Sequence, residues 1–544
     1  MSAIAAPRRS LLALDAAVLA AAFLAAFTRI ADLDFWWHLK TGEVIAKTGR
    51  IPRVDIFSFT AAGAEYIDHE WLFQLLQWWT YSTLGPAGIA VLKCLVIGVT
   101  FALVARYCAR DGAGAWAAFG LAALGLAGAV TRLIERPEIF STLFTVVTVL
   151  VLLRFEKSGN RRILAVLPLI CALWANVHAA VIVGLVVQML FILATFLERR
   201  PNVVPLGVAF AASVAASGIN PFGYRVLSVP FELTRIIESG IVENAEWMRP
   251  TFRMAPVFWI AAVGVGIIFA LRFRSTPVFK LLLFAFLAYV STRYVRNVGL
   301  FCTFLPLLLS DALRSVNRIS RVTVAATGLV ALLVISILYF PFERGVGEAS
   351  YFPDKLVQFT REKNLRGNML NSYGFGGYLI AKLYPDRRVF IDGRNEVFVP
   401  LLERLQVAQT DSRQWSALLR DFKIEYVIFE YVDQLDRVNV VNRDGTQSAF
   451  SASLTSARFP RSQWALVFWD DDGMIFVRRA GPNGQALDGE YRIVQPEGTG
   501  FMKALVAEGR ADRAGAIEEL QRKLRDDPGS RRARSLLASL TQNQ

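Results

Sequence analysis

Eleven runs of mostly apolar residues lie within the first 340 positions of this 544-residue chain. A helix needs about 20 such residues to cross the hydrocarbon core of a bilayer, and several of these runs are a little shorter. The predicted spans are 11–30, 86–105, 115–131, 138–153, 163–175, 179–196, 203–218, 255–271, 278–292, 297–313 and 322–340. The sequence therefore predicts a polytopic helical membrane domain over residues 1–342.

The excess of positive charge lies in the same part of the chain. Residues 1–340 carry 30 Lys and Arg against 18 Asp and Glu, whereas the remaining residues carry 29 against 27. This location argues against nucleic-acid binding, because Lys and Arg in short loops between spans set the topology of a membrane protein. With a cytoplasmic N-terminus, all five basic loops are cytoplasmic and the C-terminal part lies outside. These loops contain Arg106 and Arg110; Arg154, Lys157, Arg161 and Arg162; Arg199 and Arg200; Arg272, Arg274 and Lys280; and Arg314, Arg318 and Arg321.

The first outer loop, residues 31–85, is long and contains two amphipathic stretches. Phe35–Thr48 and His69–Tyr81 are predicted to be helices that lie in the membrane interface. Both contain tryptophan, which prefers that interface. Ile51-Pro52 and Ala61-Ala62-Gly63 separate the two stretches with turn-forming residues.

After residue 342, short apolar strands alternate with helices. NMLN opens a strand, a Gly-rich turn and a helix, RRVFIDGR and IEYVIFEY are predicted strands on either side of a helix at 397–422, and ALVFWDDDGMIFVRR is a predicted hairpin. This alternation predicts a small α/β domain over 343–497. Residues 498–544 predict a helical pair that resembles one tetratricopeptide unit. Such a unit cannot bury its face alone, so we expect it to pack on the α/β domain or on a protein partner.

The predicted fold is therefore mainly α. A helical membrane domain of about eleven helices is followed by a small extracytoplasmic α/β domain and a C-terminal helical pair.

The chain has only three histidines, and on this topology all of them fall at the outer face: His38, His69 and His178. Asp32, Asp34, Asp68 and Glu70 flank the first two. Further charged residues lie at outer helix ends, namely Arg132, Glu135, Arg136, Glu138, Arg225, Glu243, Glu246, Arg293 and Arg296. Ionisable groups at membrane depth are costly, so their gathering on one face indicates a functional site.

Each of these residues also has a structural interpretation. Asp32, Asp34 and Asp68 could cap helices, and His178 could be a hydrogen-bonded buried histidine. Arg293 and Arg296 could extend toward water or pair with acids. The chain contains no Cys-x-x-Cys, His-Glu-x-x-His or Gly-x-Ser-x-Gly motif, so soluble metal or nucleotide chemistry has no motif support.

One span, then an acidic residue, then a long outer loop with two interfacial helices resembles the GT-C glycosyltransferases. These include protein O-mannosyltransferases, aminoarabinose transferases of lipid A and oligosaccharyltransferases. The stretch DLDFWWHLKTGEVIAKTGRIPRVDIFSFTAAGAEYIDHEWLF is similar to the first loop of a large bacterial branch of that superfamily. LWANVHAA, GINPFGYRVL, RYVRNVGLF, NSYGFGGYLI and VFIDGRNEVF resemble further stretches of the branch, so the resemblance covers residues 10–430. It implies a GT-C-like domain and a multi-pass protein of the bacterial inner membrane with a periplasmic C-terminal domain.

The resemblance also implies a reaction, in which a sugar moves from a polyprenyl phosphate to an envelope acceptor at the outer face. A first-loop carboxylate accepts the proton of the acceptor hydroxyl, and basic side chains or a divalent metal of unknown identity stabilise the departing lipid phosphate. By position, Asp34 is the expected base, with Asp32 second. Arg293 and Arg296 are the expected phosphate ligands. His38, His69, Glu70, Asn176 and His178 are expected to line the cavity and are the candidate metal ligands.

The chain departs from two of these families. It has Asp-Leu-Asp after the first span where mannosyltransferases have an Asp-Glu pair, and it lacks the Trp-Trp-Asp motif of oligosaccharyltransferases, which puts en bloc oligosaccharide transfer in doubt. Two other functions stay open. A non-catalytic scaffold for envelope polysaccharide would act through the C-terminal domains, and a flippase would show inverted repeats, of which the sequence gives no convincing sign.

Overall fold

A computed structural model describes residues 8–242, 244–314, 316–338, 342–431, 435–441 and 447–541. The chain folds as two compact units. The first unit comprises Met1–Arg53 and Ile67–Ala349, and the second comprises Val54–Tyr66 and Ser350–Gln544. The middle of the predicted first outer loop thus belongs to the second unit, where Ser58 forms a β-bridge with Val389. The sequence of the loop did not predict that its middle folds with the second unit.

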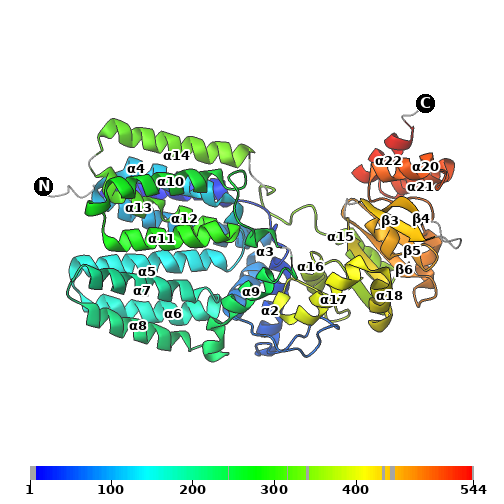
Figure 1. Cartoon of the computed structure of the whole chain (residues 1–544), viewed down its shortest axis with the longest axis horizontal. Coiled ribbons are helices and arrows are strands. Elements are labelled where there is room, and N and C mark those ends of the chain that lie inside the picture. The colour runs from blue at the N-terminus through cyan, green and yellow to red at the C-terminus, as the bar shows by residue number, and fades with distance from the viewer. Residues whose placement is uncertain are drawn as a thin grey trace. The chain divides into compact units, whose positions relative to one another are not determined.

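Helices make up nearly all of the first unit and lie side by side (Figure 1). Each of the eleven predicted spans coincides with one or more of them. Within the described part of the chain, six helical stretches are long and apolar enough to cross a membrane, and Val181–Leu197, Val203–Ser217 and Pro256–Leu271 are shorter apolar helices. The helices are α1 Arg8–Ala26, α2 Phe35–Thr48, α3 Trp71–Cys108, α4 Ala115–Ala129, α5 Glu138–Ser158, α6 Val166–Val177, α7 Val181–Leu197, α8 Val203–Ser217, α9 Val229–Glu238, α10 Pro256–Leu271, α11 Val278–Arg293, α12 Val298–Thr303, α13 Leu305–Leu313 and α14 Arg318–Leu338.

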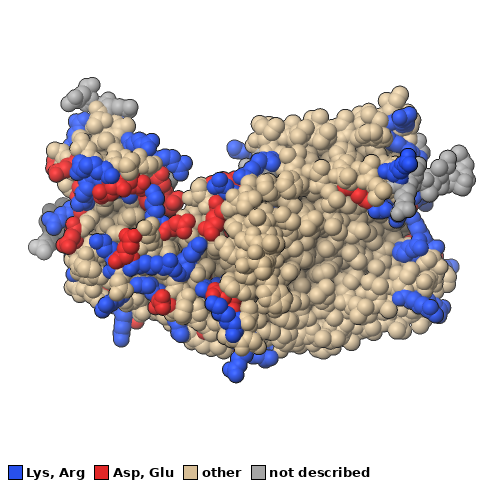
Figure 2. Space-filling model, turned by 180° about the vertical axis from the view of Figure 1, so that it is seen from behind, with Lys and Arg blue, Asp and Glu red and all other residues tan. Residues whose placement is uncertain are grey.

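The outer surface of this unit is apolar. Val204, Leu271 and Ile319 are 76%, 82% and 79% exposed, respectively. Figure 2 shows a broad surface of the helical unit that is almost free of charged residues, with Lys and Arg gathered at one end. Large apolar side chains in such numbers on a helical surface face lipid rather than water. The chain is a multi-pass membrane protein.

The first outer loop folds partly as predicted. Helix α2 spans Phe35–Thr48, as its amphipathic pattern indicates. The second interfacial stretch is not a separate element, because α3 begins at Trp71 and continues to Cys108. Its only internal break is at Gly85, whose φ of 61° and ψ of −157° suit glycine. Pro86 follows this break.

The second unit contains a four-stranded sheet with strand order β1-β2-β6-β5. β1 (Asn368–Asn371) is parallel to β2 (Ile424–Glu430), and β2 and β5 (Trp464–Trp469) are antiparallel to β6 (Gly473–Arg478). The helices of this α/β domain are α15 Asp354–Glu362, α16 Gly376–Leu383, α17 Val399–Thr410, α18 Ser412–Asp421 and α19 Leu454–Arg458. A second hairpin, β3 (Leu435–Val441) with β4 (Gln447–Ser453), was not predicted.

Three details of the second unit correct the sequence predictions. RRVFIDGR is not a strand, because its backbone bonds only briefly to the inserted segment, with Phe59 N donating to Val389 O and Val389 N to Phe57 O. The helix predicted at 397–422 is two helices, since Asp411 caps the start of α18. The C-terminal pair is three helices, α20 Thr499–Ala507, α21 Arg513–Asp526 and α22 Arg531–Thr541. Left-handed Gly509 ends the first, and Asp512 caps the second.

Candidate active site

Asp32 and Asp34 lie between α1 and α2, and both bind the same arginine. Arg136 Nη2 is 2.5 Å from Asp32 Oδ1 and 3.0 Å from Asp34 Oδ2. Asp34 occupies the N-cap position of α2, but its side chain accepts no capping hydrogen bond. It accepts instead from Trp37 Nε1 at 3.2 Å. The capping interpretation therefore does not describe Asp34, whose carboxylate is directed to Arg136.

From Arg136 a series of ion pairs with alternating sign extends through the unit. Arg136 Nη1 lies 2.8 Å from Glu246 Oε2, and Glu246 Oε1 lies 2.8 Å from Arg132 Nη1. Glu138 then bridges Arg132 and Arg296, with one carboxylate oxygen on each. We call this series the charge ladder: Asp34, Arg136, Glu246, Arg132, Glu138 and Arg296. It connects the expected base with the arginines beyond it.

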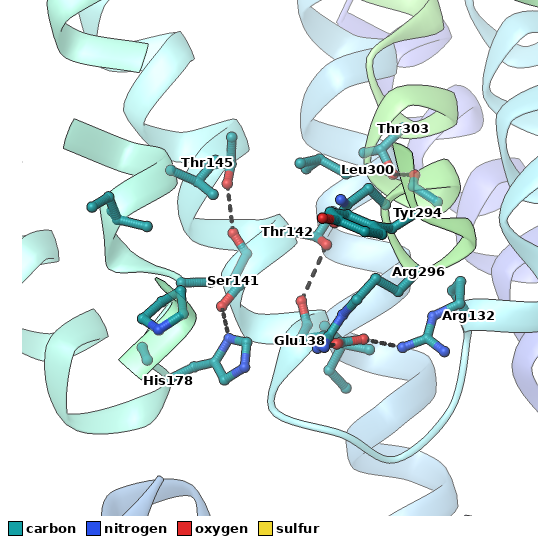
Figure 3. Close-up of a pocket in the computed structure, with 18 of the residues that line it drawn as sticks. Arg132, Glu138, Ser141, Thr142, Thr145, His178, Tyr294, Arg296, Leu300 and Thr303 are labelled. Carbon is teal, nitrogen blue, oxygen red and sulfur yellow. Dashed lines mark hydrogen bonds and ion pairs between the residues drawn. The ribbon is translucent and has the colours of Figure 1, made fainter. Parts of the chain in front are cut away.

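The far end of the charge ladder lies in a cavity of about 260 Å³ in the first unit. Arg132, Glu138 and Arg296 give it a charged part, and Figure 3 shows Glu138 between the two guanidinium groups. The remaining lining is largely apolar and includes Ile97, Phe101, Leu133, Val229, Leu233 and Leu300. A cavity with cations beside apolar walls suits an amphiphilic anion.

All three histidines of the chain converge on Glu70. The Nε2 atoms of His38, His69 and His178 each lie 3.5 Å from an oxygen of its carboxylate. Ser141 Oγ is 2.8 Å from Nδ1 of His178, and Ile67 O is 3.2 Å from Nδ1 of His69. Burial lowers the pKa of His38 and His178 to about 4, so both are neutral near pH 7. His69 and His178 also line the cavity, so the histidine group and the charge ladder border the same space.

The structure places the remaining predicted site residues less favourably. Arg293 does not line the cavity; its side chain is 39% exposed and pairs with Glu238 at 3.1 Å. Asn176 lies in the last turn of α6 and links it to α3 and to the loop after α8, since it accepts from Trp71 Nε1 at 2.9 Å and donates to Ile219 O at 2.7 Å. Glu243 lies outside the described residues.

Several residues that border the site had no role in the sequence prediction. Arg132, Arg136, Glu138 and Glu246 were noted only as charged groups at the outer face. Lys93 was missed, although a single lysine inside an apolar span is itself a signal. Its Nζ lies 2.9 Å from Glu135 Oε2 and is almost completely buried.

Glu135 in turn fixes the backbone that carries Asp32. Its Oε1 accepts from the backbone N–H groups of Ala31 at 2.7 Å and Asp32 at 3.0 Å. The loop between α4 and α5 therefore holds the first outer loop through both Glu135 and Arg136.

The two aspartates differ in access and share an unusual environment. The side chain of Asp32 is 3% exposed and that of Asp34 is 31% exposed. Burial raises the pKa of Asp32 to about 7 and also raises the pKa of Asp34, against the opposing effect of Arg136. Asp32, with a pKa of about 7, can take up a proton near neutral pH, as a general base must. Asp34 is the more accessible of the two.

The described residues do not fit a bound divalent metal. No group of three or more His, Cys, Asp or Glu side chains within the described ranges is arranged to hold one. Asp32, Asp34 and Glu246 have the oxygen ligands that such ions prefer, but they converge on Arg136.

No protein-family model matches the sequence, and no curated protein matches it. Solved structures do. The archaeal oligosaccharyltransferase AglB from Archaeoglobus fulgidus, in complex with an inhibitory peptide and a dolichol-phosphate, matches with a TM-score of 0.61. The match covers 95% of this chain and 86% of that chain at 10% identity. This chain shares the fold of that oligosaccharyltransferase.

Two further structures of the Archaeoglobus fulgidus oligosaccharyltransferase agree. The apo form matches with a TM-score of 0.57 at 12% identity, over 81% of this chain and 74% of that chain. The complex with Zn and sulfate matches with a TM-score of 0.52 at 12% identity, over 81% and 72%. Identities this low establish the fold alone, so function must be argued from the site.

Proposed function

We propose that the protein is a membrane glycosyltransferase that moves a sugar from a polyprenyl phosphate to an envelope acceptor. The observation that carries this proposal is the charge ladder, which joins the partly exposed carboxylate of Asp34 to a cavity with arginines and apolar walls. A scaffold needs no such buried series of charges, whose desolvation is costly.

Arg132 and Arg296 are the proposed phosphate ligands. One planar guanidinium group can bind two phosphate oxygens at once. Arg132 and Arg296 both line the cavity, beside apolar side chains that suit an isoprenoid chain. This assignment replaces Arg293 by Arg132. The dolichol-phosphate in the AglB complex supports a lipid phosphate as the donor.

Asp34 is the proposed base, with Asp32 second. The acceptor hydroxyl gives its proton to Asp34 while its oxygen forms a bond to the anomeric carbon of the sugar. The bond from that carbon to the phosphate oxygen breaks, and the lipid phosphate leaves with the electron pair. Arg132 and Arg296 stabilise its negative charge. His69 and His178 line the same cavity, where they would contact the sugar or the acceptor.

The proposed location is the bacterial inner membrane, with the N-terminus in the cytoplasm and the second unit in the periplasm. The five basic loops support this orientation. A donor carried by a lipid suits that location, because nucleotide sugars are not expected outside the cytoplasm.

The experiment follows labelled sugar from a polyprenyl phosphate to endogenous acceptors in native membranes. Asp34→Asn should insert normally and lose transfer, and Asp32→Asn should reduce it. Asp15→Asn is the matched control, because Asp15 pairs with Arg106 away from the site. Normal transfer in both site variants would remove the proposed base, and no transfer by the wild type would remove the proposed function.

A further inference from the structure

The geometry points to Arg136 as a built-in replacement for a divalent metal ion among Asp32, Asp34 and Glu246. We infer that the site needs no metal, because this guanidinium supplies the positive charge. For catalysis the inference rests on the proposed function, whereas for metal binding it stands alone.

The three carboxylates come from separate parts of the first unit. Asp32 and Asp34 precede α2, and Glu246 lies in the short helix η5 (Ala245–Trp247). Carboxylates that converge from separate segments are the usual ligands of Mg²⁺, Mn²⁺ and Ca²⁺. Here all three contact one guanidinium, at 2.5, 3.0 and 2.8 Å. The place of the cation is thus taken by a side chain.

The single positive charge of the Arg136 guanidinium does not balance the negative charges of the three carboxylates around it. Glu246 shares its other oxygen with Arg132, but Asp32 and Asp34 have no second arginine among the described ion pairs. Asp32 Oδ2 and Arg136 Nε are buried without a hydrogen-bond partner within the described part of the chain. We therefore expect Asp32, Asp34 and Glu246 to bind a divalent cation if Arg136 were absent.

The carboxylates are held in place by contacts that do not involve Arg136. Glu135 Oε1 accepts from the backbone N–H groups of Ala31 and Asp32, and Lys93 holds its other oxygen. Trp37 Nε1 donates to Asp34. Removal of the guanidinium should therefore leave the oxygen atoms near their present positions, with a space between them.

The test compares purified full-length wild type, Arg136→Ala and Arg136→Lys. The exposed Arg53→Ala is the control for loss of an arginine. After treatment with a chelator, each protein is titrated with MnCl₂ while its thermal unfolding and bound metal are measured. We expect no shift for the wild type, Arg136→Lys or Arg53→Ala, and a rise of several degrees with bound Mn²⁺ for Arg136→Ala.

Tightly bound metal in the wild type, or the same Mn²⁺ response in the wild type and Arg136→Ala, would overturn the inference. If Arg136→Ala fails to fold, the wild type and Arg136→Lys decide, because either one binding Mn²⁺ would contradict the inference and neither binding it would support it.

Sugar transfer gives the second readout. The wild type should transfer at the same rate with and without chelator, and Arg136→Ala should lose about 100-fold or more and recover in part with Mn²⁺. Loss of wild-type transfer in chelator, restored by Mn²⁺, would refute the inference and leave the proposed function intact. No transfer under any condition would remove the proposed function, and the Mn²⁺ titration would still decide the inference.

Discussion

Arg136 in the first unit and Arg394 in the second unit each contact more than one carboxylate, and their surroundings differ. In the second unit, Arg394 lies 2.7 Å from Asp55 and 2.6 Å from Asp392, and its side chain is 1% exposed. Every carboxylate oxygen there has a partner: Asp55 also accepts from Phe57 N and from Ser58 N and Oγ, and Asp392 accepts from Arg394 alone. The rings of Phe57, Tyr66 and Phe398 face the guanidinium.

Arg136 has three carboxylates, a buried Nε without a partner in the described residues, and a continuing ion-pair series that ends in a cavity. A buried polar group that is fully satisfied fixes structure, whereas one that is left short of partners is ready to bind or to exchange protons. The comparison therefore separates a structural cluster at Arg394, which anchors the inserted segment Val54–Tyr66, from the cluster at Arg136, for which we propose a function.

The largest effect should come from Arg394→Ala. It would leave two buried aspartates without their cation, which costs about 3–5 kcal/mol in the free energy of unfolding of the second unit. Pulse proteolysis of the full chain, followed at cleavage sites in the second unit, measures this. Arg404→Ala is the control, because its pair with Asp421 is exposed and should be worth at most about 1 kcal/mol. Equal effects of the two substitutions would show that the Arg394 cluster is not structural.

Arg132→Ala should lower transfer. It removes one guanidinium from the cavity, and loss of such a charge-stabilising group lowers kcat/KM by about 100- to 1000-fold. The measurement is transfer from a labelled polyprenyl-phosphate sugar, with Arg53→Ala as the control. A loss of this size in Arg293→Ala and none in Arg132→Ala would show that Arg293, as predicted from the sequence, binds the phosphate in place of Arg132.

The contrast between the units also explains what the sequence could predict of the fold. The helices of the first unit were predicted correctly because lipid demands long apolar helices, which leave a strong sequence pattern. Within the described residues, six helical stretches are long and apolar enough to cross a membrane, against the eleven spans predicted. The strand predicted at RRVFIDGR was wrong because its apolar residues are buried against Phe57–Thr60, a segment far away in the chain. An apolar run reports burial, but it does not say whether a strand partner of sufficient length exists.

The same limit applies to the site. The gathering of the histidines and first-loop acids followed from topology, since side chains on one membrane face have few places to go. The choice between Arg132 and Arg293 did not, because both lie at helix ends that the predicted topology places outside, and only packing decides which one faces the cavity. Arg293 ends α11 beside Glu238, whereas Arg132 follows α4 and meets Glu138.

The pH dependence should differ in sign for transfer and for stability. The pKa of Asp32 is about 7 in the folded protein and about 3.9 in the unfolded chain, so the folded protein binds this proton more tightly. Its contribution to stability is therefore complete below pH 4 and is lost as the pH rises through 7. Transfer that needs an ionised aspartate should increase over this range, by up to about tenfold per pH unit.

Unfolding midpoints and transfer rates measured between pH 5 and 8 test both directions, with Asp32→Asn as the comparison. That variant should lose the decline in stability. An unchanged decline would mean that another group, such as Asp68, whose burial also raises its pKa to about 7, is responsible.

The smallest effect should come from Glu138→Gln, which asks whether the charge ladder holds the arginines for the phosphate or blocks them. Glu138 lies between Arg132 and Arg296, where a phosphate would have to bind, so its negative charge opposes the donor. Repulsion between two charges at about 4 Å in water is about 1 kcal/mol, so its removal should lower the apparent KM for the lipid donor roughly fivefold. Glu138→Asp keeps the charge and should keep the KM. An increase in KM for Glu138→Gln would mean that the carboxylate positions the two guanidinium groups, and that the phosphate binds them from another side.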